Sequence, residues 1–187
     1  SDIEDEVEFI FVAVPTPTKN GKIDSQFLKS AIKEAMITIN KNAKKTMLII
    51  KSTIAPGITE KVIIPMLNKS NKKLGEDFFL AINPEFLREG FAIQDQLKPH
   101  VVVIGCQDKT TKEILKKFYK KIYKNDVKIV FTNYSTAELI KYSNNAFLAT
   151  KISFINSISN LCQKIPGANI DDVAKVIGMD PRIGNLF

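Results

Sequence analysis

Two carboxylates stand four residues apart in the stretch "AINPEFLREGFA", which overlaps the apolar run "DFFLAI". The run indicates a buried strand, Pro84 ends it, and Gly90 interrupts the chain again beyond the acids Glu85 and Glu89. Paired acids beside a ligand crevice can move protons to and from a substrate or activate a water molecule. The plainer interpretation is the preference of a helix's first turn for negative charge.

Hydroxyl groups and prolines follow the other apolar runs, in "VPTPT" (14–18), "KSTIAPG" (51–57) and "FTNYSTAEL" (131–139). In a parallel sheet the carboxyl ends of the strands meet at one edge, where loops and helix N-termini can surround a ligand. Taken singly, Pro15 and Pro17 are ordinary turn residues, and Ser52 and Thr53 are an ordinary helix cap. Taken together, the four strand ends predict a polar crevice.

A lysine and an amide fall on one face of the helix expected after residue 134. Glu138, Lys141 and Asn145 are spaced three and four residues apart, so their side chains lie on the same side. Lys141 could pair with Glu85 or Glu89 and act as an acid, a base or an oxyanion stabiliser. A solvent-facing ion pair with Glu138 explains the spacing equally well.

Alternating strands and helices are expected to position these residues. A strand at 7–14 should be covered on both faces, and Asp24 should cap the helix that follows it. The Lys-rich helix near residues 110–125 should bury Ile114, Leu115, Phe118 and Ile122. The further strands are expected at "TMLIIKST", "DFFLAI", "HVVVIG" and "VKIVF". This order predicts an α/β domain with a mostly parallel sheet.

The pattern changes at Tyr134, where one long helix is expected to begin with a capping box of Ser135 and Glu138. Its apolar residues spread over more than one face, so it should need more than one packing partner. A last helix, "IDDVAKVIG", ends at Gly178. We therefore divide the chain into residues 1–133 and 134–187.

Composition narrows the function. The net charge of +7 rests on 25 Lys and only two Arg, which favours a solvated surface over nucleic-acid recognition. No apolar run is long enough for a membrane span, and the acidic start "SDIEDEVE" does not resemble a signal peptide. Cys106 and Cys162 lack metal-ligand spacing and are expected to be reduced core thiols of a cytoplasmic protein.

Five motifs in this order resemble the UDP-glucose/GDP-mannose dehydrogenase family: "VPTPT", "KSTIAPG", "INPEFLREGFAIQD", "AELIKYSNNAFLATKISFINSIS" and "GMDPRIG". The resemblance implies oxidation of the C6 alcohol of a nucleotide sugar to a carboxylate, with two NAD and a thiohemiacetal on a cysteine. UDP-glucose is favoured as the substrate, giving UDP-glucuronate for polysaccharide biosynthesis. The resemblance also implies that residues 1–133 are the second half of a Rossmann-like NAD-binding domain. Residues 134–187 would then be a central helical domain that forms a homodimer through the long helix.

The resemblance also assigns roles to individual residues. Thr53, Glu85, Lys141 and Asn145 match the family's catalytic positions, and Arg182 matches an arginine that reaches the sugar in the neighbouring subunit. NAD would lie along Val14, Pro15, Thr16, Pro17, Thr18, Ser52, Thr53 and Glu89. The substrate would contact Glu85, Phe86, Leu87, Arg88, Glu89, Lys141, Asn145 and Arg182. No metal is implied.

The sequence also departs from the family pattern. Its eight glycines include no G-x-G-x-x-G spacing, and neither cysteine stands at the family's nucleophile position after "DPRIG". We therefore expect the chain to be the middle of a longer enzyme and to be inactive without the missing parts. The alternatives are a dehydrogenase of GDP-mannose or another nucleotide sugar, and a non-catalytic dimerisation module; a basic nucleic-acid binder would show steeply salt-dependent binding.

Overall fold

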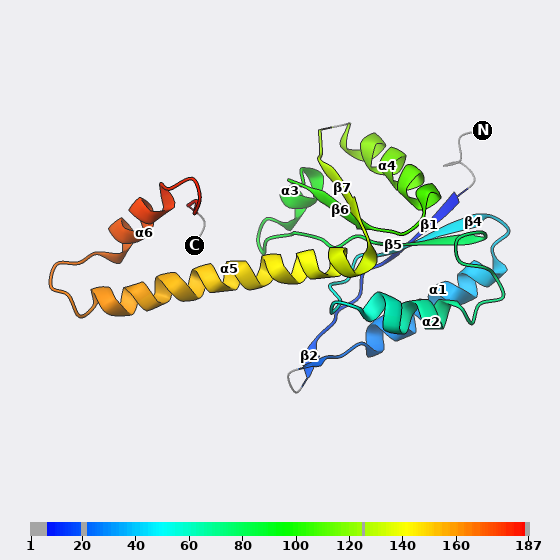
Figure 1. Ribbon diagram of the computed structural model, residues 1–187, viewed down its shortest axis with the longest axis horizontal. Coiled ribbons are helices and arrows are strands. Elements are labelled where there is room, and N and C mark those ends of the chain that lie inside the picture. Colours follow the sequence, from blue (N-terminus) through cyan, green and yellow to red (C-terminus); the bar gives the residue numbers. More distant parts are fainter. Residues whose placement is uncertain (1–6, 20–21, 125, 186–187) are drawn as a thin grey trace. The chain divides into compact units, whose positions relative to one another are not determined.

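The computed structural model describes residues 7–19, 22–124 and 126–185 (Figure 1). A five-stranded sheet has the order β1-β4-β5-β6-β7, and every neighbouring pair is parallel except β5 and β6. Its strands are β1 (Val7–Val12), β4 (Lys45–Ile50), β5 (Phe78–Ile82), β6 (Val102–Gly105) and β7 (Ile129–Thr132). The predicted α/β class with a mostly parallel sheet is confirmed.

The helices alternate with these strands. They are α1 (Gln26–Lys41), α2 (Ile64–Leu67), α3 (Ala92–Leu97), α4 (Lys109–Tyr123), α5 (Tyr134–Cys162) and α6 (Ile170–Gly178). One turn of π-helix (Thr59–Ile63) leads directly into α2, and a short hairpin of β2 (Thr18–Lys19) and β3 (Lys22–Ile23) precedes α1. No helix within the described ranges combines the length and apolarity that crossing a bilayer requires.

The sheet is covered on both faces, by α1 and α2 on one side and by α4 on the other (Figure 1). Strand β4 illustrates the arrangement, because successive side chains of a strand point to opposite faces. Leu48 and Ile50 pack with α1 and α2, whereas Met47 and Ile49 pack with α4, and all four are fully buried. This burial on both faces explains the continuous apolar run in the sequence.

Three local expectations are wrong. Strand β1 lies at the edge of the described sheet, where Phe11 is 45% exposed, so β1 is not covered on both faces. In α4 the half-exposed Ile122 is outside the apolar face, and Tyr119 is buried instead. Helix α1 begins one residue later than expected, although the Asp24 carboxylate still accepts a hydrogen bond from the Gln26 N–H at 2.9 Å.

The chain divides into two compact units, one up to Tyr142 and one from Ser143, so the division falls inside α5. Within the second unit, Asn169 caps α6 by accepting hydrogen bonds from the first-turn N–H groups of Asp171 and Asp172. The Lys151 Nζ donates to the backbone oxygen of Ile183 at 2.9 Å. The domain boundary expected between residues 133 and 134 stays a prediction.

Candidate functional site

A cavity of about 440 Å³ opens at the carboxyl ends of β1, β4 and β5. Its walls come from three segments that follow these strands and from α3. The lining residues are Ala13, Val14, Pro15, Thr16, Lys51, Ser52, Thr53, Glu85, Leu87 and Gln96. The crevice predicted from the polar strand ends is therefore present, and seven of the residues expected to bind cofactor or substrate line it.

Two hydroxyl groups tie the walls of this cavity together. Ser52 Oγ accepts a hydrogen bond from the Val14 N–H and donates one to the Val14 carbonyl, both at 2.8 Å. Thr16 Oγ1 donates to the Thr53 carbonyl at 2.7 Å. Through these two bonds the hydroxyl of Ser52, a residue that is only 7% exposed, holds the loop after β1 against the loop after β4. The backbone of both loops is thus preorganised at the cavity.

Lys141 and Glu85 form the charged part of the site. Lys141 Nζ lies 3.2 Å from Glu85 Oε1, and the lysine is 5% exposed. The second oxygen of Glu85 accepts a hydrogen bond from the Leu87 N–H at 2.7 Å, which orients the carboxylate. Lys141 Nζ also lies 5.3 Å from the centre of the Phe86 ring, a cation–π contact. The sequence left open whether Lys141 pairs with an acid of the "NPEFLREG" stretch or with Glu138 in solvent. The structure contains the first arrangement, with Glu85 as the acid.

Glu138 has a different partner from either one that the sequence suggested. Its carboxylate is 1% exposed and accepts hydrogen bonds from Gly57 N–H at 2.5 Å, Thr59 N–H at 2.9 Å and Thr59 Oγ1 at 2.5 Å. The capping box with Ser135 is therefore wrong, and Asn133 Oδ1 caps α5 by accepting from the Thr136 N–H at 2.8 Å. Glu138 instead satisfies donors at the start of the helical segment that leads into α2.

A glycine lets α5 approach the sheet closely. A Cβ atom on Gly105, the last residue of β6, would lie 2.8 Å from the Ala137 Cβ and 3.0 Å from the Asn133 carbonyl oxygen. Such distances are well inside van der Waals contact, so any larger residue would push the first turn of α5 away. That turn directly precedes Glu138 and Lys141, and its distance from the sheet sets where both side chains lie.

Lys51 and Asn83 were not among the predicted site residues. Lys51 Nζ donates to Asn83 Oδ1 at 3.0 Å, and the same oxygen accepts a hydrogen bond from the Tyr119 hydroxyl. Burial lowers the pKa of Lys51, the neighbouring Glu85 raises it, and Lys141 lowers it further. A lysine at the end of a fully buried strand was the available sequence signal. Gln96, which also lines the cavity, had none.

Several predicted residues lie apart from the cavity. Glu89 is exposed, and Arg88 forms a bidentate ion pair with Asp95 through Nη2 at 2.7 Å and Nε at 3.0 Å. Asn145 and Arg182 belong to the second unit, where Asn145 is exposed and Arg182 pairs with Asp180 of the same turn at 2.5 Å. Pro17, Thr18 and Phe86 are also outside the lining. Functional roles for all of these stay predictions.

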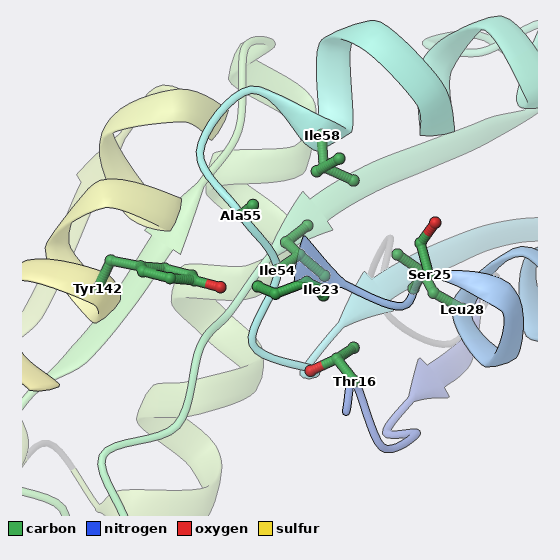
Figure 2. A pocket seen from close by; sticks show the side chains of 8 residues that line it. All are labelled: Thr16, Ile23, Ser25, Leu28, Ile54, Ala55, Ile58 and Tyr142. Carbon is green, nitrogen blue, oxygen red and sulfur yellow. The ribbon is translucent and has the colours of Figure 1, made fainter. Parts of the chain in front are cut away.

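A second cavity, of about 400 Å³, lies beside the first and is mainly apolar (Figure 2). It is lined by Thr16, Ile23, Ser25, Leu28, Ile54, Ala55, Ile58 and Tyr142. Figure 2 shows the Tyr142 ring extending from α5 toward Ile54 and Ala55. Burial raises the pKa of the Tyr142 hydroxyl. Thr16, in the loop after β1, lines both cavities.

The cysteines lie outside both cavity linings. Cys106 and Cys162 are free and partly buried rather than fully buried. Cys106 packs against the core on the α4 side of the sheet, so the expectation of a core thiol holds for it in part. Burial, assisted by Asp108, raises the pKa of the Cys106 thiol to about 11, so little thiolate forms near neutral pH. Within the described ranges, no cluster of His, Cys, Asp and Glu side chains could hold a metal ion.

Comparison with known protein families decides the identity. Residues 1–123 match the NAD binding domain of the UDP-glucose/GDP-mannose dehydrogenase family, and residues 135–187 match its central domain. The chain belongs to this family. The predicted resemblance is thereby confirmed, and so is NAD as the cofactor that the family's domain binds.

Individual members of the dehydrogenase family agree closely with the chain. The UDP-glucose 6-dehydrogenase of Rickettsia bellii is 44% identical over 96% of this chain, and that of Rhizobium meliloti is 40% identical over 96%. The crystal structure of a GDP-mannose dehydrogenase from Pseudomonas aeruginosa matches 96% of the chain with a TM-score of 0.85 and 34% identity. A UDP-glucose dehydrogenase from Pyrobaculum islandicum matches 98% with a TM-score of 0.83 and 33% identity. The chain spans 40% of the length of each of these two sequence relatives and 41% of each of these two structures.

The strand-end cavity fits part of an NAD molecule. Its volume of about 440 Å³ lies in the range of small-ligand pockets, and it occupies the place where α/β sheets bind ligands. The main chain of residues 13–16 forms a wall that Ser52 holds in place.

Proposed function

We propose that the protein is an NAD-dependent nucleotide-sugar 6-dehydrogenase acting on UDP-glucose. The observation that carries the proposal is the ion pair between the buried Lys141 and the partly exposed Glu85 at the strand-end cavity, in a chain of the dehydrogenase family. An amine and a carboxylate at this distance can share the proton changes that oxidation of an alcohol requires. The product would be UDP-glucuronate.

In this proposal Val14, Pro15, Thr16, Ser52 and Thr53 hold the nicotinamide end of NAD. Bound NAD would accept the hydride that leaves C6 of the sugar. The hydroxyl proton has to leave C6–O as that hydride leaves, and Glu85 takes part in this transfer. Lys141 stabilises the negative charge that develops on the oxygen.

The second oxidation needs a water molecule to complete the carboxylate, and the chain offers two groups for it. Thr53 lines the cavity beside Glu85 and orients the water, while Glu85 removes its proton. Asn145 lies one helical turn beyond Lys141 along α5. By its match to the family's catalytic asparagine, its amide is assigned to the oxyanion that Lys141 also stabilises. Removal of one such donor typically lowers the rate by about 10² to 10³.

We also place the protein in the cytoplasm as a homodimer formed through α5. Large apolar side chains of this helix are exposed in the single chain, which supports an interface there. They are Leu139, Phe147, Leu148, Ile152, Phe154 and Leu161. Light scattering coupled to gel filtration should give twice the monomer mass.

The test is NADH formation by the full-length protein that carries this chain, with UDP-glucose, GDP-mannose and UDP-N-acetylmannosamine as substrates. Oxidation of an alcohol to a carboxylate removes four electrons, so about two NADH should form per sugar. Turnover with UDP-glucose alone supports the proposal. Turnover only with GDP-mannose would select the second candidate, which the match to the Pseudomonas aeruginosa GDP-mannose dehydrogenase favours. A properly folded protein that turns over no nucleotide sugar would overturn both and leave the dimerisation module.

A further inference from the structure

Lys51 is a charged residue of the strand-end cavity to which no role has been assigned. It directly follows β4, and its N–H donates to the Val12 carbonyl at 2.8 Å, which holds the backbone between two strand ends. Its side chain lines the cavity together with Thr53 and Glu85. Lys51 therefore shares a wall with two residues of the proposed reaction.

The surroundings of Lys51 differ from those of Lys141. Lys141 pairs with a carboxylate, whereas Lys51 Nζ donates to a neutral amide oxygen, that of Asn83, at 3.0 Å. Among the residues that the structure describes, no carboxylate oxygen forms an ion pair with Lys51 Nζ within 4.0 Å. The charged groups that act on it are Glu85 from the loop after β5 and Lys141 from α5.

Asn83 is the point through which Lys51 acts on the site. The amide is 2% exposed, and its nitrogen donates to the Val103 carbonyl at 2.8 Å. Its oxygen accepts from Lys51 Nζ and from the hydroxyl of Tyr119, a residue of α4 whose pKa is raised by burial. Asn83 is thus fixed by three elements, and Glu85 lies two residues further along the chain.

We propose that Lys51 is a positioning residue: bonded to Asn83, it fixes the turn that carries Glu85, and it places a positive charge on the cavity wall. This inference rests on the proposed function. The two lysines then have separate tasks, because Lys141 contacts the carboxylate directly and Lys51 acts through Asn83 and through its charge. A nearby positive charge favours the ionised form of a carboxylate, which is the form that accepts a proton.

The test compares Lys51→Met with Lys51→Arg in the full-length protein. Loss of the charge in Lys51→Met should lower kcat/KM about 10-fold or more and move the acid limb of its pH profile upward by roughly 0.5 to 1 pH unit. Lys51→Arg keeps a permanent charge and a donor for Asn83, so it should restore most activity and the position of the acid limb. Lys45→Met removes an exposed lysine from the opposite end of the same strand and should change neither.

Two kinetic results would overturn the proposal. If Lys51→Arg is as inactive as Lys51→Met, the lysine is needed as an amine that exchanges a proton, which Arg cannot do. If the acid limb stays in place in Lys51→Met, the charge of Lys51 does not act on the site. Purely structural damage would lower activity without moving the limb.

A readout without turnover separates this inference from the proposed function. Competitive acetylation followed by mass spectrometry gives the pH midpoint of labelling for each lysine. Removal of the Glu85 charge in Glu85→Gln should lower the midpoint of Lys51 and leave that of Lys45 unchanged. An unchanged Lys51 midpoint would overturn the inference. If the wild-type protein turns over no nucleotide sugar but the midpoint shifts, the proposed function fails while the coupling of Lys51 to Glu85 stands.

Discussion

Lys141 Nζ, on the second turn of α5, lies 3.2 Å from Glu85 Oε1 in the loop after β5. The two residues are remote in sequence, and the pair joins α5 to the edge of the sheet where the strands end. Because the lysine is almost fully buried while the carboxylate is partly exposed, the carboxylate remains accessible to a ligand. This geometry leads to the first prediction.

Lys141→Met should lower kcat for NADH formation by about 10² to 10³, because the charge that stabilises the developing oxyanion is lost. Glu85→Gln should lower it by about 10² to 10⁴ through loss of proton transfer. The double variant should be much less impaired than the product of the two effects, since the groups act as a unit. Lys116→Met, on the exposed face of α4, is the matched control and should retain wild-type rates. Independent, multiplicative losses would contradict the joint role.

The features of the fold and the site that depend on residues close together in the sequence could be predicted from it. The buried runs of β4 and β5 and the crevice at their carboxyl ends follow from composition and from the rule that parallel strand ends converge. The spacing on α5 placed Glu138 and Lys141 on one face, but three partners for Lys141, namely Glu85, Glu89 and Glu138, remained possible. Helix spacing describes only local neighbours, and the actual partner, Glu85, comes from another element.

The failures have the same physical origin. Ser135 and Glu138 satisfied the sequence pattern of a capping box, yet unpaired N–H groups at Gly57 and Thr59 compete for the same carboxylate and bind it. Lys51 was passed over because its one signal, a place at the end of a buried strand, is equally typical of a lysine that extends into solvent. Its side chain contacts Asn83, whose oxygen also accepts from Tyr119, and these three residues meet only in the folded chain.

Glu138→Gln should destabilise the protein by roughly 2 to 4 kcal/mol, because the amide removes an acceptor and places a donor against buried N–H groups. Urea unfolding monitored by circular dichroism measures the change. The amides of Gly57 and Thr59 should also exchange hydrogen faster in the variant. Glu113→Gln is the control, since Glu113 is exposed and its contact with Lys109 is 3.7 Å, and it should change stability by less than about 0.5 kcal/mol. Equal effects of both substitutions would contradict the role assigned to Glu138.

The ion pair of Arg88 and Asp95 should make a pH-dependent contribution to stability. Hydrogen bonds from the Arg88 side chain, and then from its backbone N–H, lower the pKa of Asp95 from 3.8 to about 2. A carboxyl group with a lowered folded-state pKa stabilises the fold above its unfolded pKa, and that stabilisation disappears as pH falls through the folded value.

The difference in urea midpoint between wild type and Asp95→Asn should therefore be constant above about pH 5 and shrink between about pH 4 and 2. Because the Arg88 side chain is exposed, added salt should reduce the difference at neutral pH. A difference that does not vary with pH would mean that packing of Asp95, and not its charge, stabilises the loop.

Gly105→Ala should destabilise the protein by about 1 to 3 kcal/mol, because the new methyl group would lie 2.8 Å from the Ala137 Cβ. Removing that Cβ tests the cause directly. Ala137→Gly should cost about 1 kcal/mol or more by itself, through helix propensity and lost packing, and Ala146→Gly on an exposed part of α5 measures the propensity share. In the double variant Gly105→Ala/Ala137→Gly the loss should be smaller than the sum of the two single losses. The relief should be incomplete, since the Asn133 carbonyl would still lie 3.0 Å from the added methyl. Urea unfolding of the four proteins gives the coupling energy, and additive losses within about 0.5 kcal/mol would show that Gly105 is not what brings α5 to the sheet.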